Sequence, residues 1–167
     1  MGGNRVLGNF HNDGFTVELS NLPDHKFLQI TCDVIIHDTW DGNMPSPNGP
    51  DLWNIRVNRK QNINTNSDFF YQTSFSNFSS RRRPQSFPNR YPSFNDPKSA
   101  NQGGAYGICA DSLNASGSTF YRIDEILRHE EDVAFIRFFD ELVQTNTEDP
   151  FCDESWSLDN LIITIWN

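Results

Sequence analysis

The feature that most constrains the fold is a strict alternation of apolar and polar residues in several segments. Residues 14–22, GFTVELSNL, place Phe15, Val17 and Leu19 on one side of an extended chain and polar residues on the other. Residues 26–40, KFLQITCDVIIHDTW, continue this pattern over five apolar positions. A period of two residues is typical of a β-strand with one buried face, and it differs from the 3.6-residue period of an amphipathic helix.

Further segments are predicted to be strands on similar grounds. PDLWNIRVN and SWSLDNLIITIWN alternate, while DFFYQTSFSN and STFYRIDEIL are rich in the aromatic, β-branched and hydroxyl side chains that strands favour. Residues 131–142, EDVAFIRFFDEL, are apolar on both faces, so a helix is the alternative there, but the β-branched and aromatic content favours a buried strand. About seven strands without a long amphipathic helix indicate an all-β, antiparallel β-sandwich.

The length of 167 residues fits a single domain, residues 1–167, with one long irregular insertion. The insertion spans about residues 77–107, is rich in Pro, Ser and Asn, and shows neither a strand nor a helix period. A patternless segment of this length is unusual inside one domain, and it indicates a functional or partner-bound segment that packs either on its own sandwich or on another protein.

Charge and hydropathy limit the partners. A formal net charge of −9 makes nucleic acid an unexpected partner. No apolar run approaches about 18 residues, so direct insertion into a membrane is not expected. The first residues, MGGNRVLGNF, lack the apolar core of a signal peptide. The chain is therefore expected to be either intracellular or a piece of a longer secreted protein.

The three cysteines form neither a metal-binding pair nor an even disulfide framework. Cys32 lies in an apolar strand pattern and is interpreted as a small buried hydrophobic residue. A bridge between Cys109 and Cys152 is compatible with an extracellular location, and the sequence leaves the disulfide state open. The histidines and cysteines are too scattered for a zinc site.

Six acidic residues lie at or near predicted strand ends: Asp38, Asp41, Asp51, Asp153, Glu154 and Asp159. If the first long strand and the last one are neighbours, HDTWDGN and FCDESW converge at one edge of the sandwich. Carboxylates brought together repel one another unless a cation or a proton relieves the repulsion. Calcium prefers such oxygen ligands on irregular loops. The alternative is that these acids cap turns and keep the strand edges soluble.

HDTWDGN, GPDLWNIRVN and the closing DESWSLDNLIITI together resemble signatures of jelly-roll modules of secreted and cell-surface proteins, similar to carbohydrate-binding modules and lectin-like sandwiches. The resemblance covers residues 14–58 and 120–167. It implies a jelly-roll sandwich, an extracellular or cell-surface location and a calcium ion held by the six acids named above.

The expected function is non-catalytic binding or adhesion within a larger assembly, with carbohydrate as a candidate ligand. Trp40, Trp53, Trp156 and Asn43 are the candidate ligand-binding residues, by ring stacking and by hydrogen bonding to hydroxyl groups. Each tryptophan can instead pack in the core, and this alternative is favoured for Trp156 and Trp166. A second expectation is a structural subunit that docks on proteins through its long insertion. A glycoside-active enzyme is less expected, and no catalytic residue is assigned.

Overall fold

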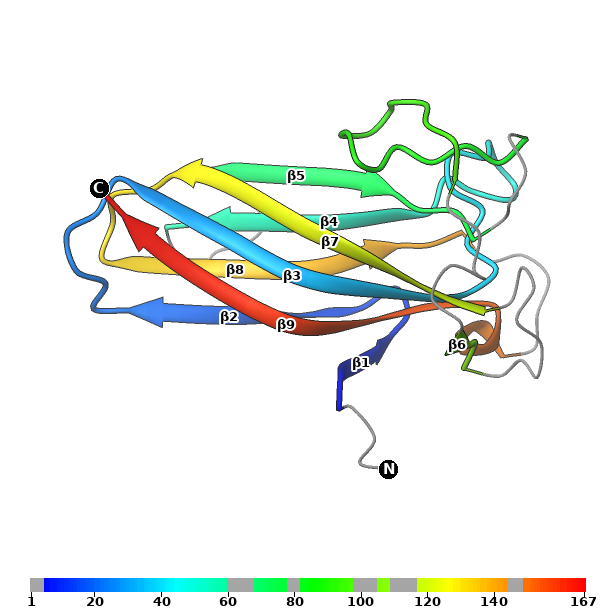
Figure 1. Ribbon diagram of the computed structural model, residues 1–167, viewed down its shortest axis with the longest axis horizontal. Helices are drawn as coiled ribbons and strands as arrows, with labels where there is room; N and C mark the ends of the chain where they lie inside the picture. The colour runs from blue at the N-terminus through cyan, green and yellow to red at the C-terminus, as the bar shows by residue number, and fades with distance from the viewer. Residues whose placement is uncertain (1–4, 60–67, 78–81, 98–104, 109–116, 144–148) are drawn as a thin grey trace.

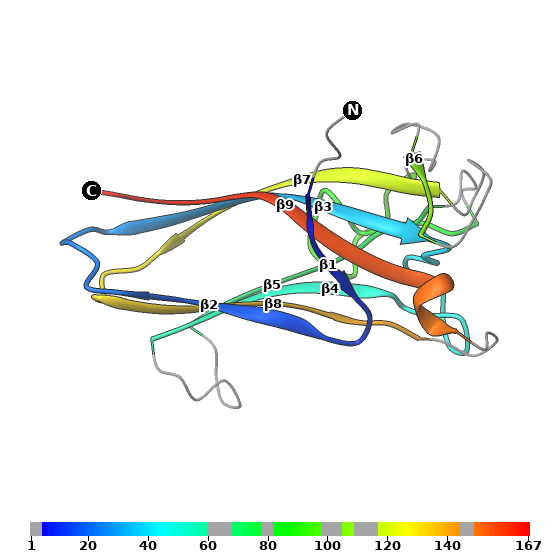
Figure 2. The same ribbon diagram turned by 90° about the horizontal axis from the view of Figure 1, so that it is seen from below.

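The computed structural model describes residues 5–59, 68–77, 82–97, 105–108, 117–143 and 149–167. Two antiparallel sheets stack face to face (Figures 1 and 2). The first sheet has the order β1-β9-β3-β7-β6, formed by β1 (Leu7–Phe10), β9 (Glu154–Trp166), β3 (Phe27–Asp38), β7 (Gly117–Arg128) and β6 (Ala105–Tyr106). The second has the order β2-β8-β4-β5, formed by β2 (Gly14–Ser20), β8 (Val133–Glu141), β4 (Leu52–Asn58) and β5 (Phe69–Ser74).

The chain passes from one sheet to the other at most connections. Without the two-residue β6, the order β1-β9-β3-β7 faces the order β2-β8-β4-β5. This is the arrangement of a jelly roll, in which two Greek keys form a double sheet. The all-β sandwich is therefore confirmed, and each segment predicted to be a strand is one. The only helix among the described residues is the short 3₁₀ helix η2 (Pro150–Cys152), and none there is long and apolar enough to cross a membrane.

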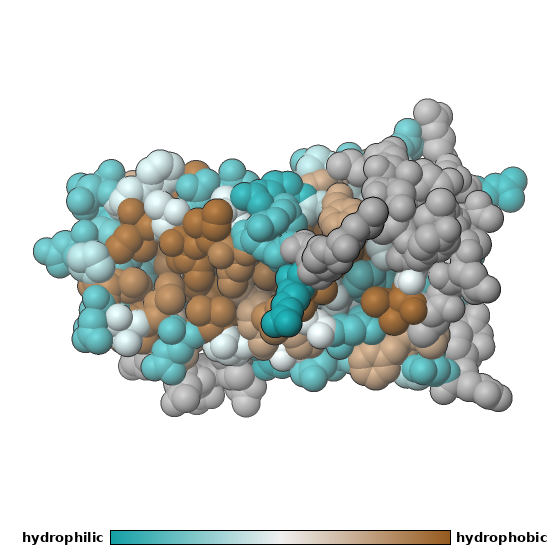
Figure 3. All heavy atoms as spheres, turned by 60° about the horizontal axis from the view of Figure 1, so that its bottom comes forward, coloured by the Kyte–Doolittle hydropathy of each residue, from teal (hydrophilic) through white to brown (hydrophobic). Residues whose placement is uncertain are grey.

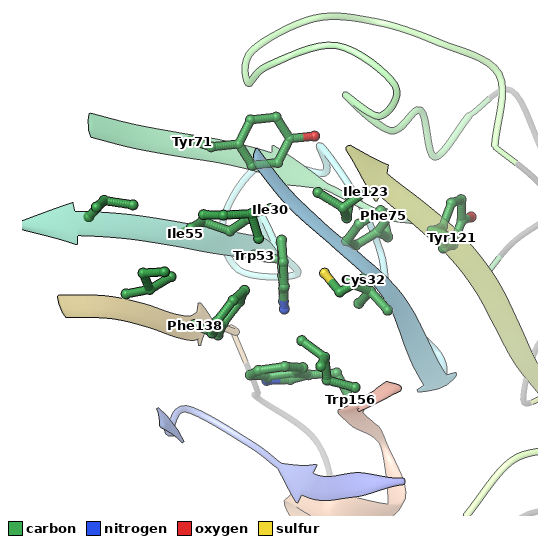
Figure 4. Packing of buried hydrophobic residues seen from close by; sticks show 14 of the residues in the cluster. Ile30, Cys32, Trp53, Ile55, Tyr71, Phe75, Tyr121, Ile123, Phe138 and Trp156 are labelled. Carbon is green, nitrogen blue, oxygen red and sulfur yellow. The ribbon is translucent and has the colours of Figure 1, made fainter. Parts of the chain in front are cut away.

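The core lies between the sheets and is dominated by aromatic rings (Figure 4). Trp156 contacts Phe10, with ring centroids 4.8 Å apart, and meets Trp53 edge to face at 5.7 Å. Phe75 packs on Tyr121 at 4.4 Å. Edge-to-face and offset pairs add to the free energy gained by burying the rings, so this cluster is expected to dominate stability.

A β-bulge divides β9 into two halves. Asp33 of β3 pairs with Asp159, whereas Thr31, two residues earlier, pairs with Ile162. Asn160 adopts a left-handed conformation with φ of 50° in the bulge, and its backbone N–H donates to Asp159 Oδ1 at 2.8 Å. The extra residue reverses the alternation, so the inward side chains have even numbers before the bulge and odd numbers after it.

The described part of the insertion packs on its own sandwich. The backbone N–H groups of Phe87 and Tyr91 donate to β5 at Ser74 O and Gln72 O, at 3.1 and 2.8 Å. Arg90 donates to Phe70 O at 2.7 Å and forms an ion pair with Glu125 of β7 at 3.0 Å. The segment therefore lies along the outer edge of β5, the edge that does not pair with β4, and its contact with β7 links the two sheets (Figure 1).

Candidate functional site

The predicted convergence of HDTWDGN and FCDESW is confirmed, because β3 and β9 are neighbours. Asp38, the last residue of β3, is the cross-strand partner of Glu154, the first residue of β9. Just beyond this pair, the Thr39 N–H donates to Asp153 O at 2.6 Å. We call this part of the molecule, with Asp41 and Asp51 from the following loop, the acidic end.

Backbone groups donate hydrogen bonds to the buried acids of the acidic end. Asp51 has no exposed surface, and its Oδ2 and Oδ1 accept from Asp41 N at 2.6 Å and Val143 N at 3.3 Å. Asp38 is also fully buried, and its Oδ2 accepts from Ile108 N at 3.1 Å. These contacts fix the loops that join the sheets.

The electrostatics of the acidic end favour a proton on its buried acids. Burial raises the pKa of Asp51 to about 8, the negative charge of Asp153 acts in the same direction, and hydrogen bonds from Val143 and Glu154 act against it. A hydrogen bond between two carboxyl groups requires one proton between them. Burial and the hydrogen bond between Asp51 and Glu154 therefore favour a proton shared by the two carboxyl groups.

The remaining predicted acids have separate roles. Asp41 forms an ion pair with Arg83 and lies in a short bridge to Ser76. A side-chain oxygen of Asp153 accepts a hydrogen bond from the Thr39 hydroxyl group. Asp159 lies in the β9 bulge, five residues after Glu154 and so roughly 17 Å along the strand. The structure therefore gathers five of the six predicted ligands and leaves Asp159 apart.

The described side chains of the acidic end do not fit a calcium ion. Among the residues that the structure describes, no three His, Cys, Asp or Glu side chains are arranged to hold a metal ion. Both oxygens of Asp51 accept hydrogen bonds from backbone groups, and the Asp41 carboxylate is paired with Arg83. A calcium ion would have to displace these donors. Calcium binding stays a prediction.

The tryptophans expected at a ligand site lie in the core. Trp40, Trp53 and Trp156 have no exposed surface, so the core-packing alternative holds for all three, including Trp156, for which it was favoured. Trp166, for which core packing was favoured, is 46% exposed. The Trp40 indole N–H donates to Ser155 O of β9 at 2.9 Å, so this ring is fixed against the first residues of β9.

Asn43 connects the loop after β3 to the insertion. Its Oδ1 accepts from the hydroxyl groups of Ser74 and Ser86, and its Nδ2 donates to Ser93 O at 2.6 Å. This amide already serves the fold through both of its polar atoms. The structure therefore offers a structural explanation for Asn43, in addition to the predicted role in ligand binding.

His37 is a buried polar residue of β3 next to the acidic end. Its Nδ1 and Nε2 lie 2.7 Å from Ser118 Oγ and 2.9 Å from Ser157 Oγ. Burial lowers the pKa of His37 to about 4. The ring is therefore neutral in the folded protein at pH values where an unfolded chain would begin to bind a proton.

Acidification is expected to destabilise the fold through His37. Between pH 6.5 and about 4, the unfolded chain binds a proton at His37 that the folded protein does not bind. The contribution of the neutral His37 ring to stability is therefore complete above pH 6.5. It is lost as pH falls to about 4, by up to about 3 kcal/mol. Urea unfolding at several pH values should show that the free energy of unfolding falls less steeply with decreasing pH in His37→Gln than in the wild type. His11→Gln is the matched control, and equal slopes in the wild type and His37→Gln would contradict the prediction.

A different group of side chains occupies the outer face of the β2-β8-β4-β5 sheet. Thr16, Arg137, Arg56 and Phe70 are successive cross-strand partners across the four strands, and we call them the arginine row. The guanidinium of Arg56 lies 5.4 Å from the Phe70 ring centroid. Arg56 and Arg137 both lie over Phe139, at 5.2 and 5.1 Å.

The arginine row was missed by sequence reasoning. Alternation places Arg56 and Arg137 on the outward faces of their strands, which was the available signal. It does not reveal that the two arginines are direct partners, because that depends on the register between β4 and β8. No ion pair of Arg137 with an acid is seen in the described part of the chain.

Comparison with known proteins identifies no family for this chain. No family model matches it, and neither a curated protein nor a solved structure is similar enough to count as a match. The fold is therefore established by the strand topology, and a function has to be argued from the residues themselves.

Proposed function

We propose that this chain is a non-catalytic binding module that recognises acidic polysaccharide through the arginine row. The observation that carries the proposal is the direct pairing of Arg56 with Arg137 on one sheet face. Two guanidinium groups placed directly opposite each other concentrate positive charge on one part of the sheet face, and such a local positive potential attracts an anion. The chain as a whole has a net charge of −9, yet these two arginines face each other, and a bound anion would explain this arrangement.

The chemistry of the arginine row suits a sugar that carries carboxylate or sulfate groups. Guanidinium groups donate two parallel hydrogen bonds to such oxyanions. The Phe139 ring lies under both guanidinium groups and holds them by cation–π contacts. Phe70 is 37% exposed and supplies an apolar surface for a sugar ring, while the exposed Thr16 supplies a hydroxyl group. Combining an apolar surface with a few polar groups is typical of ligand sites.

A non-catalytic role is supported by the state of the acids. Glycoside hydrolysis needs two carboxyl groups about 5–10 Å apart that flank the substrate. Asp51 and Glu154, the adjacent acids at the acidic end, are both buried and hydrogen-bonded to each other. They are therefore poorly placed to meet a polymer.

An extracellular or cell-surface location is part of the proposal. Cys152 is disulfide-bonded and Cys32 is free, while Cys109 lies outside the described residues. Disulfides persist in oxidising compartments, which supports a secreted parent protein. Acidic polysaccharides are plausible partners for a module in such a location.

Loss of Arg137 is expected to weaken polysaccharide binding at least tenfold, because a charge-assisted hydrogen bond contributes about 1.5–3 kcal/mol. Titration calorimetry would compare alginate, which carries carboxylates, with dextran sulfate and neutral dextran. Arg122→Ala on the other sheet is the matched control, since Arg122 is an exposed arginine paired with Asp33. Binding of either acidic polymer should weaken in Arg137→Ala and with added salt, while Arg122→Ala should bind as the wild type does.

Three outcomes would overturn the proposal. The first is no binding of either acidic polymer at low salt. The second is equal loss of binding in both arginine variants, which would indicate non-specific charge attraction. The third is equal binding of neutral dextran, which would leave the arginines without a role. A preference between the carboxylated and the sulfated polymer identifies the anion.

The assembly role predicted from the insertion is less well supported by its described part, which packs on β5 and β7. The apolar half of β9 is a more suitable surface for contact with a protein, and it is independent of the arginine row.

A further inference from the structure

The second half of β9 has a free edge. β1 pairs with β9 only at Trp156, Ser157 and Leu158. From Asn160 to Trp166, β3 is the one strand partner that β9 has among the described residues. Among the described residues, no strand pairs with the backbone N–H and C=O groups on the other edge of this half of β9.

The sequence of this free edge lacks the usual protection. Residues 160–166 read NLIITIW, with no charged residue, no proline and no glycine. Edge strands of soluble proteins are normally protected by lysine, proline, a covering segment or short length. A β-bulge also protects an edge, and β9 has one at Asn160, but the six strand residues after it, 161–166, carry no charge.

Apolar side chains surround this edge on the outer face of the sheet. Ile162 is 54% exposed and Trp166 is 46% exposed. Phe27 of β3, the cross-strand partner of Trp166, is 40% exposed, and Ile126 of β7 is 51% exposed. Figure 3 shows hydrophobic residues gathered on the half of the molecule that carries the C-terminus. Contiguous apolar surface of this kind marks an interaction site.

The inner side of the same half-strand is also incompletely covered. Leu161, Ile163 and Ile165 point toward the core but are only half-buried, as are Val17 and Leu19 of β2. β2 is the edge strand of the opposite sheet, so these residues lie on the open long side of the sandwich. A strand added beside β9 would cover this side as well as pair with the free edge.

We propose that a second copy of this chain pairs antiparallel with the free edge of β9, so that two sheets join across a twofold axis. A twofold contact brings the same segment of both copies together, so it must be complementary to itself. With the axis at Ile163, Leu161 of one copy lies beside Ile165 of the other. No charged residue lies within residues 160–166, so no like charges meet.

Charge makes the salt dependence of this dimer diagnostic. Each copy carries a net charge of −9, so the two repel at long range although the contact itself is uncharged. Salt screens that repulsion, and the apolar contact is unaffected by screening. The dimer dissociation constant should therefore fall as salt rises, which is the opposite of an interface held by ion pairs.

Sedimentation equilibrium on the full chain, over a concentration series at low and high salt, tests the proposal. The wild type should form dimers, and Ile162→Lys and Thr164→Lys should each raise the dissociation constant at least tenfold by placing like charges near the axis. Phe120→Lys is the control, because Phe120 is 47% exposed on the same sheet but lies on β7. Circular dichroism would verify that all variants fold.

A monomeric wild type at about 100 µM would overturn the proposal, and so would dimers that persist in both β9 variants. If Phe120→Lys dissociates the dimer as strongly as Ile162→Lys does, the contact is through the sheet face and the edge-pairing proposal is wrong. Polysaccharide binding by the arginine row lies on the opposite sheet, so its presence or absence leaves this test unchanged.

Discussion

Replacing Trp156 by alanine is expected to lower the free energy of unfolding by about 3–5 kcal/mol, the range for removing a large aromatic side chain from a core. Trp156 has no exposed surface and its ring contacts Phe10, Phe15 and Trp53. Phe10 comes from β1 and Phe15 from β2, so the ring joins the N-terminal strands of both sheets to β9. The cavity left by alanine would loosen all three contacts at once.

Trp166 supplies a control of the same residue type on the same strand. It is 46% exposed, so Trp166→Ala should cost less than about 1 kcal/mol. Urea unfolding, followed by circular dichroism, would measure both variants. Trp156→Phe, which keeps an aromatic ring, should fall between Trp156→Ala and the wild type. Equal losses for the two alanine variants would contradict the position of Trp156 in the core.

Local alternation predicts the strands of this chain well because the period of two is a property of consecutive residues. It cannot locate the β9 bulge, since Asn160 looks like any polar residue in an alternating run. Asp159 lies apart from the other acids of the predicted calcium set because the extended strand carries it roughly 17 Å from Glu154, and in the bulge it accepts the Asn160 N–H. The convergence of Asp38 with Glu154 was predictable only on the condition that β3 and β9 are neighbours.

Contacts between segments distant in sequence account for what the sequence could not predict. Trp40 follows β3, so local pattern does not decide whether it points into the core, whereas alternation places Trp53 on the apolar face of β4 with Ile55 and Val57. The arginine row depends on two strand registers, and neither is encoded within a single strand. The described part of the insertion contacts β5 through separate hydrogen bonds, such as those to Ser74 O and Gln72 O, and contacts of this kind impose no period on the sequence.

Stability is expected to fall as pH rises toward 8, because of Asp51. Its folded pKa, about 8, lies above the ordinary value of 3.8, so the folded protein binds the extra proton between these limits. The stabilisation from this proton is complete below pH 3.8 and is lost as pH rises to about 8, by about 1.4 kcal/mol per pH unit and about 6 kcal/mol in total. His37 acts in the opposite direction below pH 6.5, so the loss should be visible between pH 6.5 and 8 and level off above.

Glu154→Gln is expected to reduce this loss, because the amide donates a hydrogen bond to an ionised Asp51 and carries no charge of its own, while the burial of Asp51 stays as it is. Above pH 8 the variant should therefore be more stable than the wild type by about 2 kcal/mol or more, measured by urea unfolding in EDTA. Glu141→Gln is the control, since Glu141 is an exposed acid on β8. Repeating the stability measurements of the wild type and Glu154→Gln in millimolar calcium tests the calcium prediction. That prediction requires calcium to stabilise the wild type above pH 8 and Glu154→Gln to lose this stabilisation. If calcium prevents the wild type from losing stability as pH rises to 8, and Glu154→Gln abolishes that effect of calcium, then a cation holds the acidic end and the interpretation of a shared proton is wrong.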